Sequence, residues 1–367
     1  MRILLIISLF VISIFADNYI FNPDLNLDIN LSNKVVEKND INNTGEILWE
    51  RNHTEENISY DIIDGDYHNM KIAVILNKRK FFQYIPSLMN SMNAYILAKD
   101  IKYTISLFDK SKDFQSQLDY ITQNYDYIFI YLTKENEIKY LNQYPNNYFF
   151  IPTLNRSQIM SIIPSNNIFF GGLDYKKQVM QLNQYVDDKV VIFYEDNDLS
   201  QYVTSLIDMN LSFSLDRDIV QYPLKYSINC NNSYVYLNTK VVDSAQILSN
   251  FSYKKIKTKS ILSTQLNYSP LLFSLTTSYD VRNMIIANSI LNVPVYIEDN
   301  NLNLNSDIDF NWLNFTSDVL LNLAYNIEVD NMIDNLNDFN LHLYYNQVYY
   351  KSNLYKIFQN GFIKIEN

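Results

Sequence analysis

Cysteine is almost absent from this chain, since Cys230 is the only one in 367 residues. A single cysteine excludes an internal disulfide, so an apolar core must hold the fold together. Hydrophobic residues make up 47% of the sequence, which is enough for such a core. Glycine and proline are also scarce, with five and eight copies. The sequence has neither a glycine-rich phosphate loop nor a Gly-x-Ser-x-Gly nucleophile elbow, which argues against both of those chemistries.

Histidine is equally rare, and the three copies are scattered along the chain (His53, His68 and His342). Cys230 has no partner at the spacing of metal ligands, so we expect no metal and no cofactor. None of the three histidines is well placed to act as the base in nucleophilic catalysis. The adjacent carboxylates Glu195 and Asp196 are more typical of a helix-capping turn than of an acid/base pair. We therefore expect a protein that is not an enzyme.

The net charge of −11 argues against nucleic acid and against anionic membrane surfaces as partners. Residues 1–16 are typical of a secretory signal peptide: Met-Arg, an apolar run to Phe15, then Ala16. The run is short of the ~20 residues that span a bilayer, although an uncleaved N-terminal anchor is the alternative. No other stretch is typical of a membrane span, so we expect none after cleavage.

Asparagine is abundant, and Asn-x-Ser/Thr triplets occur for example at Asn57, Asn155, Asn210, Asn250 and Asn314. They either arise by chance or are glycosylated, which would indicate a eukaryotic receptor ectodomain or secreted glycoprotein. Residues 17–69 are polar and without periodicity, which predicts a flexible tail. Within it, Ile47, Leu48 and Trp49 are candidates for docking on the body of the protein.

From Lys71 onward, strand patterns alternate with helix patterns, which predicts parallel βαβ units and an α/β fold. The predicted strands are 72–76, 103–108, 127–132, 148–154, 168–170, 190–194, 212–220, 234–237, 260–265 and 293–297. Helices are predicted around 85–96, 114–125, 135–141, 175–186, 199–207, 242–251 and 319–327, with a basic loop at 77–80 and an acidic loop at 298–309. The end of the chain, 342–350 and 354–365, is typical of one antiparallel hairpin.

The pattern restarts at Ile168, where a strand ends in the adjacent pair Gly171 and Gly172. Because glycine tolerates sharp turns and close backbone approach, this pair indicates the start of a second domain. We predict a first α/β domain from 70–167 plus 282–330. The second is predicted from 168–281 plus 331–367 and includes the C-terminal hairpin.

Several segments resemble the type 1 periplasmic binding-protein family, whose fold is that of branched-chain amino acid binding proteins. Asn167 to Gln178 is similar to the passage between the two domains, and Lys189 to Asp196 to the strand and acidic turn that follow. Leu262 to Pro270 and Ile286 to Ile290 resemble parts of an uncharacterised exported bacterial subgroup.

The resemblance covers roughly residues 70–365 and implies two doubly wound, Rossmann-like domains joined by a hinge of about three crossovers. It also implies a soluble, monomeric, periplasmic protein that closes around a small polar ligand without covalent chemistry. A membrane transporter is the implied partner. The alternative is a cell-envelope interaction or scaffold protein with the same fold and no small ligand, whose partner is another envelope protein.

Ligands of open α/β sheets bind beyond the carboxyl ends of the strands. The polar residues expected there are Lys78, Arg79, Lys80, Asp109, Asn155, Arg156, Ser157, Asp174, Glu195, Asp196, Asn197, Thr239, Thr264 and Gln265. Arg79 and Arg156 are candidate clamps for an anionic group, because guanidinium binds carboxylate with two hydrogen bonds. Amino-acid-binding members of the family usually have small Gly, Ser or Thr residues after the first strand, whereas this chain has Asn-Lys-Arg-Lys at 77–80. The alternative for each candidate is that it lies in a solvated loop and contacts no ligand.

Overall fold

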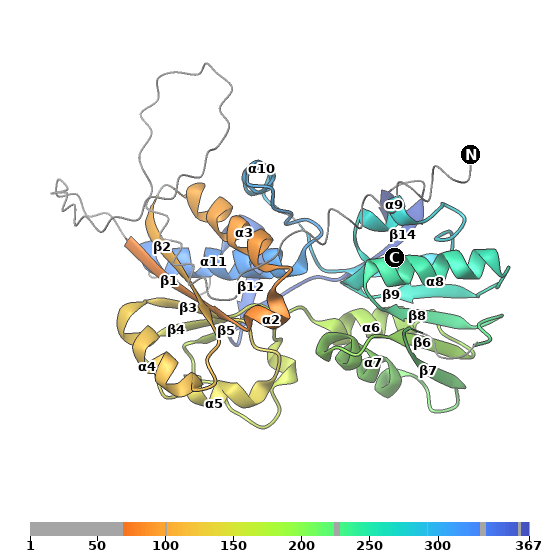
Figure 1. Cartoon of the computed structure of the whole chain (residues 1–367), viewed down its shortest axis with the longest axis horizontal. Helices are drawn as coiled ribbons and strands as arrows, with labels where there is room; N and C mark the ends of the chain where they lie inside the picture. Colours follow the sequence, from red (N-terminus) through yellow and green to blue (C-terminus); the bar gives the residue numbers. More distant parts are fainter. Residues whose placement is uncertain are drawn as a thin grey trace, which may run out of the picture.

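The computed structural model describes residues 69–99, 101–223, 228–291, 293–330, 335–358 and 361–366. The predicted signal peptide and the predicted tail, apart from its last residue, lie outside these ranges. Within them, the strands form two sheets, one of eight strands and one of seven. Each sheet is the centre of one lobe, and the two lobes lie side by side (Figure 1). We call them the first lobe and the second lobe, in chain order.

The first sheet has the strand order β11-β12-β13-β5-β4-β3-β1-β2. Six of its strands, from β13 to β2 in this order, are parallel, and β12 and β11 add antiparallel pairs at the β11 end. Their bounds are β1 Asn69–Leu76, β2 Lys102–Asp109, β3 Tyr127–Ile130, β4 Tyr148–Ile151, β5 Ile168–Phe170, β11 Asn335–Leu336, β12 Leu341–Tyr344 and β13 Gln347–Tyr349.

Helices cover both faces of the first sheet, which explains why its strands are apolar at consecutive positions. Val74 of β1 packs with α3 and α11, and its neighbour Ile75 packs with α4 and α5. The helices of this lobe are α2 Lys78–Phe81, α3 Ile85–Leu97, α4 Phe114–Asn124, η1 Glu135–Glu137, α5 Ile138–Leu141, η2 Arg156–Gln158, α10 Val295–Asn303, α11 Trp312–Asp330 and η4 Asn337–Phe339.

The second sheet repeats the same plan in the order β15-β14-β10-β9-β8-β6-β7. Strands β10 to β7 in this order are parallel, and β14 and β15 are antiparallel additions. Their bounds are β6 Val190–Tyr194, β7 Arg217–Gln221, β8 Tyr234–Asn238, β9 Ser260–Ser263, β10 Met284–Asn288, β14 Asn353–Phe358 and β15 Gly361–Lys364.

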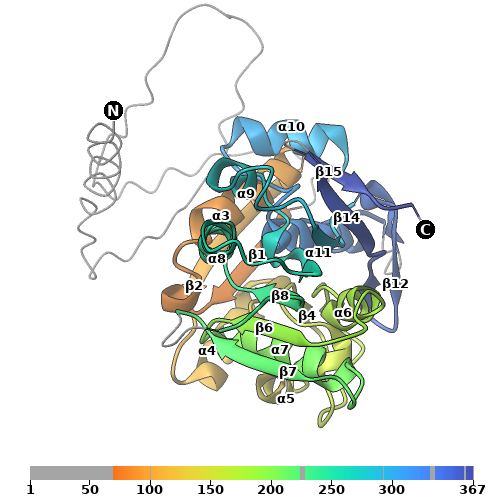
Figure 2. The same cartoon turned by 90° about the vertical axis from the view of Figure 1, so that its right-hand side faces the viewer.

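The helices of the second lobe are α6 Tyr175–Asn183, α7 Asp198–Asn210, α8 Val241–Tyr253, η3 Gln265–Asn267 and α9 Leu271–Leu275. Ile192 of β6 packs with α6 and α7, while its neighbour Phe193 packs with α8. An end-on view of this lobe shows these helices around the strands (Figure 2). Both lobes are therefore doubly wound α/β layers, as predicted.

Within the described residues, the chain passes between the two sheets three times, at 171–174, 289–294 and 350–352. This agrees with the hinge implied by the family resemblance. Strand membership nevertheless differs from the predicted domain boundaries. β5 belongs to the first sheet, where it pairs with β4 and Phe169 stacks on Phe150 at 5.5 Å. β10 belongs to the second sheet, where it pairs with β9.

The glycine pair at the first crossover is needed for space. A Cβ atom on Gly172 would lie 2.2 Å from the carbonyl carbon of Leu154 and 2.5 Å from the amide nitrogen of Asn155. On Gly171 it would lie 2.7 Å from the side chain of Leu320. Neither glycine has a positive φ angle. The pair therefore marks a close backbone approach at the exit from the first sheet.

The single C-terminal hairpin that we predicted is wrong. β12 and β13 form one hairpin in the first sheet, and β14 and β15 pair in the second. The physical reason is the turn at Tyr345 and Asn346, where both residues have positive φ angles of 46° and 58°. Such a two-residue turn reverses the chain at once, so the strand from 342 pairs with 347–349.

The strand predicted at 293–297 is also wrong, because α10 begins at Val295. Pro294 precedes the first turn, and Ile297 is buried, since α10 packs on α3. Part of the predicted acidic loop is therefore helix. The strand predicted from 212 begins only at Arg217, and the basic loop at 77–80 contains the short helix α2.

Candidate functional site

The strand order of the first sheet reverses between β1 and β3, and ligands of open α/β sheets bind at such a switch point. A cavity of about 200 Å³ lies there, at the carboxyl ends of the two strands. It is lined by Asn77, Lys80, Phe81, Lys110, Tyr131, Thr133, Lys134, Asn136 and Glu137. We call it the switch-point cavity.

Side chains hold the backbone of the segment after β1 in place. The Asn77 side chain accepts a hydrogen bond from the Lys80 amide at 3.0 Å and thereby caps α2. The Lys78 amide donates to the carboxylate of Asp109 at 2.9 Å, which ties this segment to the end of β2. Lys80 then lines the switch-point cavity, whereas Arg79 is exposed and does not line it.

Positive charge prevails in the switch-point cavity. Lys80, Lys110 and Lys134 line it, and the carboxylates of Glu137 and Asp198 interact with them. Lys110 is hydrogen-bonded to Glu137, and Lys80 Nζ lies 2.7 Å from Asp198 Oδ2 on the second lobe. The hydrogen bond from Lys80 lowers the pKa of Asp198 despite its partial burial. Of the charged side chains that line the cavity, three are lysines and one is a glutamate, so the lining favours an anionic ligand.

The corresponding position in the second lobe is already filled. The switch point of the second sheet lies between β6 and β8, where the Glu195 carboxylate accepts a hydrogen bond from the Lys240 amide at the start of α8. Asn197 Nδ2 donates to the same carboxylate at 3.2 Å. Burial raises the pKa of Glu195, although the bond from the Lys240 amide acts in the opposite direction. At this end of the second sheet, the acceptor of these hydrogen bonds is therefore the chain's own carboxylate.

A second and larger cavity of about 510 Å³ lies between the lobes. We call it the lobe-junction groove. The first lobe contributes Thr133, Lys134, Glu135, Leu154, Ser157, Gln158 and Met160, and the second lobe contributes Lys176, Tyr202, Leu206, Met209 and Asn210. It shares Thr133 and Lys134 with the switch-point cavity, so the two cavities adjoin.

The candidates after β4 have mainly structural contacts. Asn155 is buried and caps η2, and its Nδ2 donates to the Gly172 carbonyl at 2.9 Å. The amide of Arg156 donates to Gln347 Oε1 at 2.7 Å, but its side chain lines neither cavity. Ser157 lines the lobe-junction groove. Of the two predicted clamps, Arg79 and Arg156, neither lies at the switch-point cavity.

Candidates from the second lobe are mostly caps or core residues. Asp174 caps α6 through the Lys177 amide at 2.9 Å, and Asn197 caps α7. Thr239 is buried with its hydroxyl 2.7 Å from that of Ser244. Thr264 is buried. Gln265 accepts from the Gln178 side chain at 3.2 Å and from the Ser289 amide at 3.0 Å. The last contacts join η3, α6 and the second crossover.

Several residues that line the switch-point cavity were missed by the sequence analysis. Tyr131, Thr133 and Lys134 follow β3, and Lys110 comes directly after β2. The rule that ligands lie beyond strand ends applies to the third strand as well. The third strand was predicted to end at Leu132, so this rule already indicated that the residues around its end belong to the site.

Two negative findings apply to the described residues. In these ranges, no helix is both long enough and apolar enough to cross a bilayer. No group of three His, Cys, Asp or Glu side chains in the same part of the chain is arranged to hold a metal ion.

No protein-family model matches the chain, and no curated protein matches its sequence. Solved structures do match. One is a branched-chain amino acid ABC transporter protein from Thermus thermophilus with bound valine (12% identity, 82% of this chain and 96% of that one, TM-score 0.60). Another is a solute-binding protein of an ABC transporter from R. palustris in complex with 4-hydroxybenzoate (11% identity, 82% of this chain and 96% of that one, TM-score 0.61).

A third match is LpoA from Haemophilus influenzae, at 14% identity and a TM-score of 0.54, covering 83% of this chain and 59% of that one. At such identities the likeness is one of fold. The fold of this chain is that of the type 1 periplasmic binding proteins, which confirms the predicted class.

Proposed function

We propose that the chain is an exported solute-binding protein that holds a small polar ligand with an anionic group, without covalent chemistry. The single observation that carries the proposal is the switch-point cavity. It lies where open α/β sheets bind their ligands, and its ammonium groups outnumber the nearby carboxylates. The matching position of the second sheet is closed by Glu195, so the ligand's charge is held by the first lobe.

The matching solved structures support this proposal, because they include ABC transporter proteins with small molecules bound. The Thermus protein was solved with valine, and the R. palustris protein with 4-hydroxybenzoate. Both ligands carry a carboxylate. On this basis we propose a periplasmic location after removal of the leader, a transporter as partner and no enzymatic activity. N-terminal sequencing of the mature protein tests the cleavage, which we expect after Ala16.

Native mass spectrometry of the gently purified protein tests the binding function. We expect a discrete added mass that disappears on denaturation. For a ligand identified in this way, Lys134→Ala should weaken binding by about 1.5–3 kcal/mol, because a hydrogen bond to a charged group is lost. Arg156→Ala is the matched control and should leave the affinity unchanged, since Arg156 lines neither cavity. If Arg156→Ala weakens binding and Lys134→Ala does not, the ligand site lies at the loop after β4.

An envelope interaction or scaffold protein is the second candidate function. One observation favours it: large apolar side chains are exposed where the lobes meet. A bare chain mass, together with no thermal shift across a panel of small carboxylates and phosphates, would favour this alternative over the first proposal.

A further inference from the structure

The outer face of α7 carries an apolar stripe that no part of the second lobe covers completely. Tyr202, Leu206 and Met209 line the lobe-junction groove and are spaced four and three residues apart, which is one face of a helix. Within the stripe, Leu206 is buried, with 7% of its surface exposed, whereas Met209 is 67% exposed. Phe213, four residues beyond Met209, is 96% exposed. The stripe therefore leads from the floor of the groove to the surface.

The first lobe supplies the opposite wall of the groove. Met160 lines it with 88% of its surface exposed, and Ile163 in the same loop is also 88% exposed. Glu135 fixes this loop, because its carboxylate accepts hydrogen bonds from the amide of Met160 at 2.7 Å and the hydroxyl of Ser161 at 2.9 Å. These bonds lower the pKa of Glu135. The loop thus presents Met160 to solvent in a defined position.

Scattered exposed apolar residues are normal on a protein surface, but a group around one hollow indicates an interaction site. Here Met160 and Met209 line one hollow from two lobes. Methionine is common at docking surfaces, because its flexible thioether adapts to different apolar partners. The groove has a volume of about 510 Å³, so it has room for the apolar side chains of an inserted segment.

The charges of the groove define the occupant further. Lys134 lines it from the first lobe and Lys176 from the second. The carboxylate of Glu135 is engaged by its own loop, as described above. In the described part of the chain, Lys176 has no ion pair, whereas Lys134 faces Asp198. Among the charged residues that line the groove, two lysines therefore stand against one carboxylate, that of Glu135, in a chain whose net charge is −11.

We propose that the lobe-junction groove binds an amphipathic helix of a partner protein. Its apolar side chains lie along Leu206, Met209 and Met160, and its acidic residues face Lys134 and Lys176. Amphipathic helices bind hydrophobic grooves in this way, with anchors three, four and seven residues apart. Because the two walls belong to different lobes, the helix contacts both. The groove adjoins the switch-point cavity and shares Lys134 with it, whereas Lys176 lines the groove alone and therefore tests this proposal apart from the ligand function.

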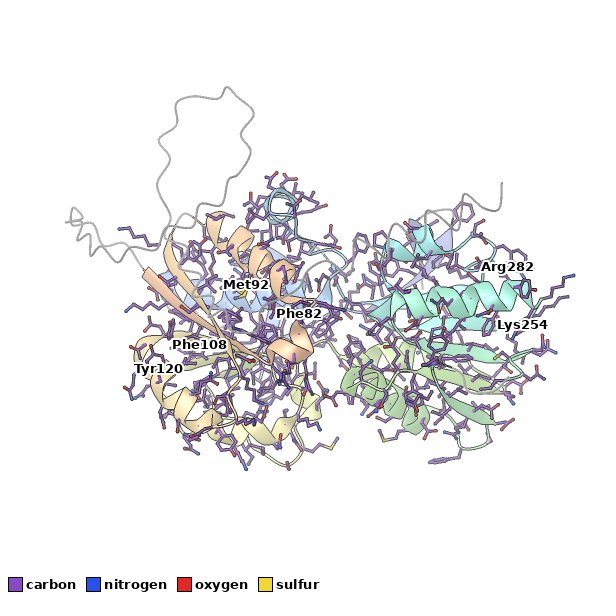
Figure 3. The ribbon with its side chains drawn as sticks, viewed as in Figure 1. Phe82, Met92, Phe108, Tyr120, Lys254 and Arg282 are labelled. Atoms are coloured by element: carbon purple, nitrogen blue, oxygen red, sulfur yellow. The ribbon has the colours of Figure 1, made fainter. Side chains whose placement is uncertain are left out.

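Site-specific photocrosslinking of the full-length protein in its own cells tests the proposal. A photoreactive residue replaces Met160 in one variant, Met209 in a second and Tyr253 in a third. Tyr253 is 85% exposed, and Figure 3 labels its neighbour Lys254 on the second lobe, away from the first. We expect Met160 and Met209 to capture the same partner peptide, acidic and amphipathic in sequence, and Tyr253 not to capture it.

Substitutions of Lys176 test whether the groove needs a positive charge at this position. Lys176→Glu should reduce the adduct at least tenfold, and Lys176→Arg should retain it. Lys254→Glu is the control for a charge reversal elsewhere on the second lobe and should have no effect. Both positions are exposed, so circular dichroism should confirm an intact fold.

Four outcomes would overturn the proposal. They are no adduct at either groove position, different partners at the two positions, an adduct insensitive to Lys176→Glu, and an adduct with a second copy of this chain. The last would assign the groove to self-association.

Discussion

Lys80 of the first lobe and Asp198 of the second form an ion pair, with Nζ and Oδ2 2.7 Å apart. Lys80 lies in α2, after the first strand of the first sheet, and Asp198 begins α7. Both side chains are about half exposed (50% and 42%), so the pair contributes only about 0–1 kcal/mol. For the hinge closure that the proposed binding function requires, that amount is enough to shift the balance between open and closed forms.

The first prediction concerns this pair. Asp198→Asn should increase the radius of gyration in small-angle X-ray scattering, because the open form becomes more populated. High salt should have the same effect on the wild type. Because the pKa of Asp198 is lowered, the pair persists at neutral pH and is lost only in acid. Asp188→Asn is the control, since Asp188 pairs with Lys259 inside the second lobe. Equal changes in both variants would exclude a role for the pair in closure.

The second prediction concerns the first crossover. Gly172→Ala places a methyl group 2.2 Å from the backbone carbon of Leu154 and should lower the free energy of unfolding by about 3 kcal/mol or more. Gly361→Ala is the matched control. A Cβ atom there meets only the Phe358 carbonyl oxygen at 3.9 Å, so stability should be nearly unchanged. Urea unfolding of both variants checks this. A stable Gly172→Ala protein would mean that the backbone at Leu154 can move away.

The third prediction concerns pH. Asp318 in α11 is completely buried, and burial raises its pKa to about 7, against 3.8 for a free side chain. Between those values the folded protein binds a proton that the unfolded chain has lost. Stability should therefore fall as the pH rises from about 4 to about 7. At a pKa shift of this size, the loss is about 4 kcal/mol.

Asp318→Asn removes this titration and keeps the shape of the side chain, including a polar group near Ser91 Oγ. The variant should match the wild type in urea unfolding at pH 4 and be more stable at pH 8. A difference of the same size at both pH values would show that Asp318 does not titrate in this range.

The fourth prediction concerns the single thiol. Cys230 is 1% exposed, and burial raises its pKa to about 11. Because the thiolate is the reactive form, Cys230 should react very slowly with a thiol reagent in the folded protein at pH 8. Urea above the unfolding midpoint should make the reaction fast and complete. Rapid reaction of the native protein would indicate local opening around β8.

Much of the fold could be predicted from local patterns. The continuous apolar run from Val190 to Tyr194 predicts a strand covered on both faces, and Pro86 predicts the first turn of a helix. Both are confirmed. The strand order could not be predicted in detail, because sheet membership depends on long-range pairing. Ile168 to Phe170 has the same local pattern whichever sheet it joins.

The candidate site was harder to predict, because its residues are defined by what their side chains contact. Asn155 and Asp174 follow strands, as ligand-binding residues do, but their oxygen atoms cap the next helical turn. Glu195 is at the correct end of its sheet, yet its carboxylate is bound by a backbone amide. Lys134 is distinguished only by the cavity beside it.

The three passages of the chain between the sheets determine when each lobe can be completed during synthesis. The first sheet acquires β13 only after residue 347 has been made, and the second needs β14 from residue 353 onward. Until then, each sheet has an open edge on β5 or β10. An open edge pairs readily with other strands, so a nascent chain that is delayed before residue 347 is prone to aggregation. The last part of the sequence thus closes both lobes almost at the same moment.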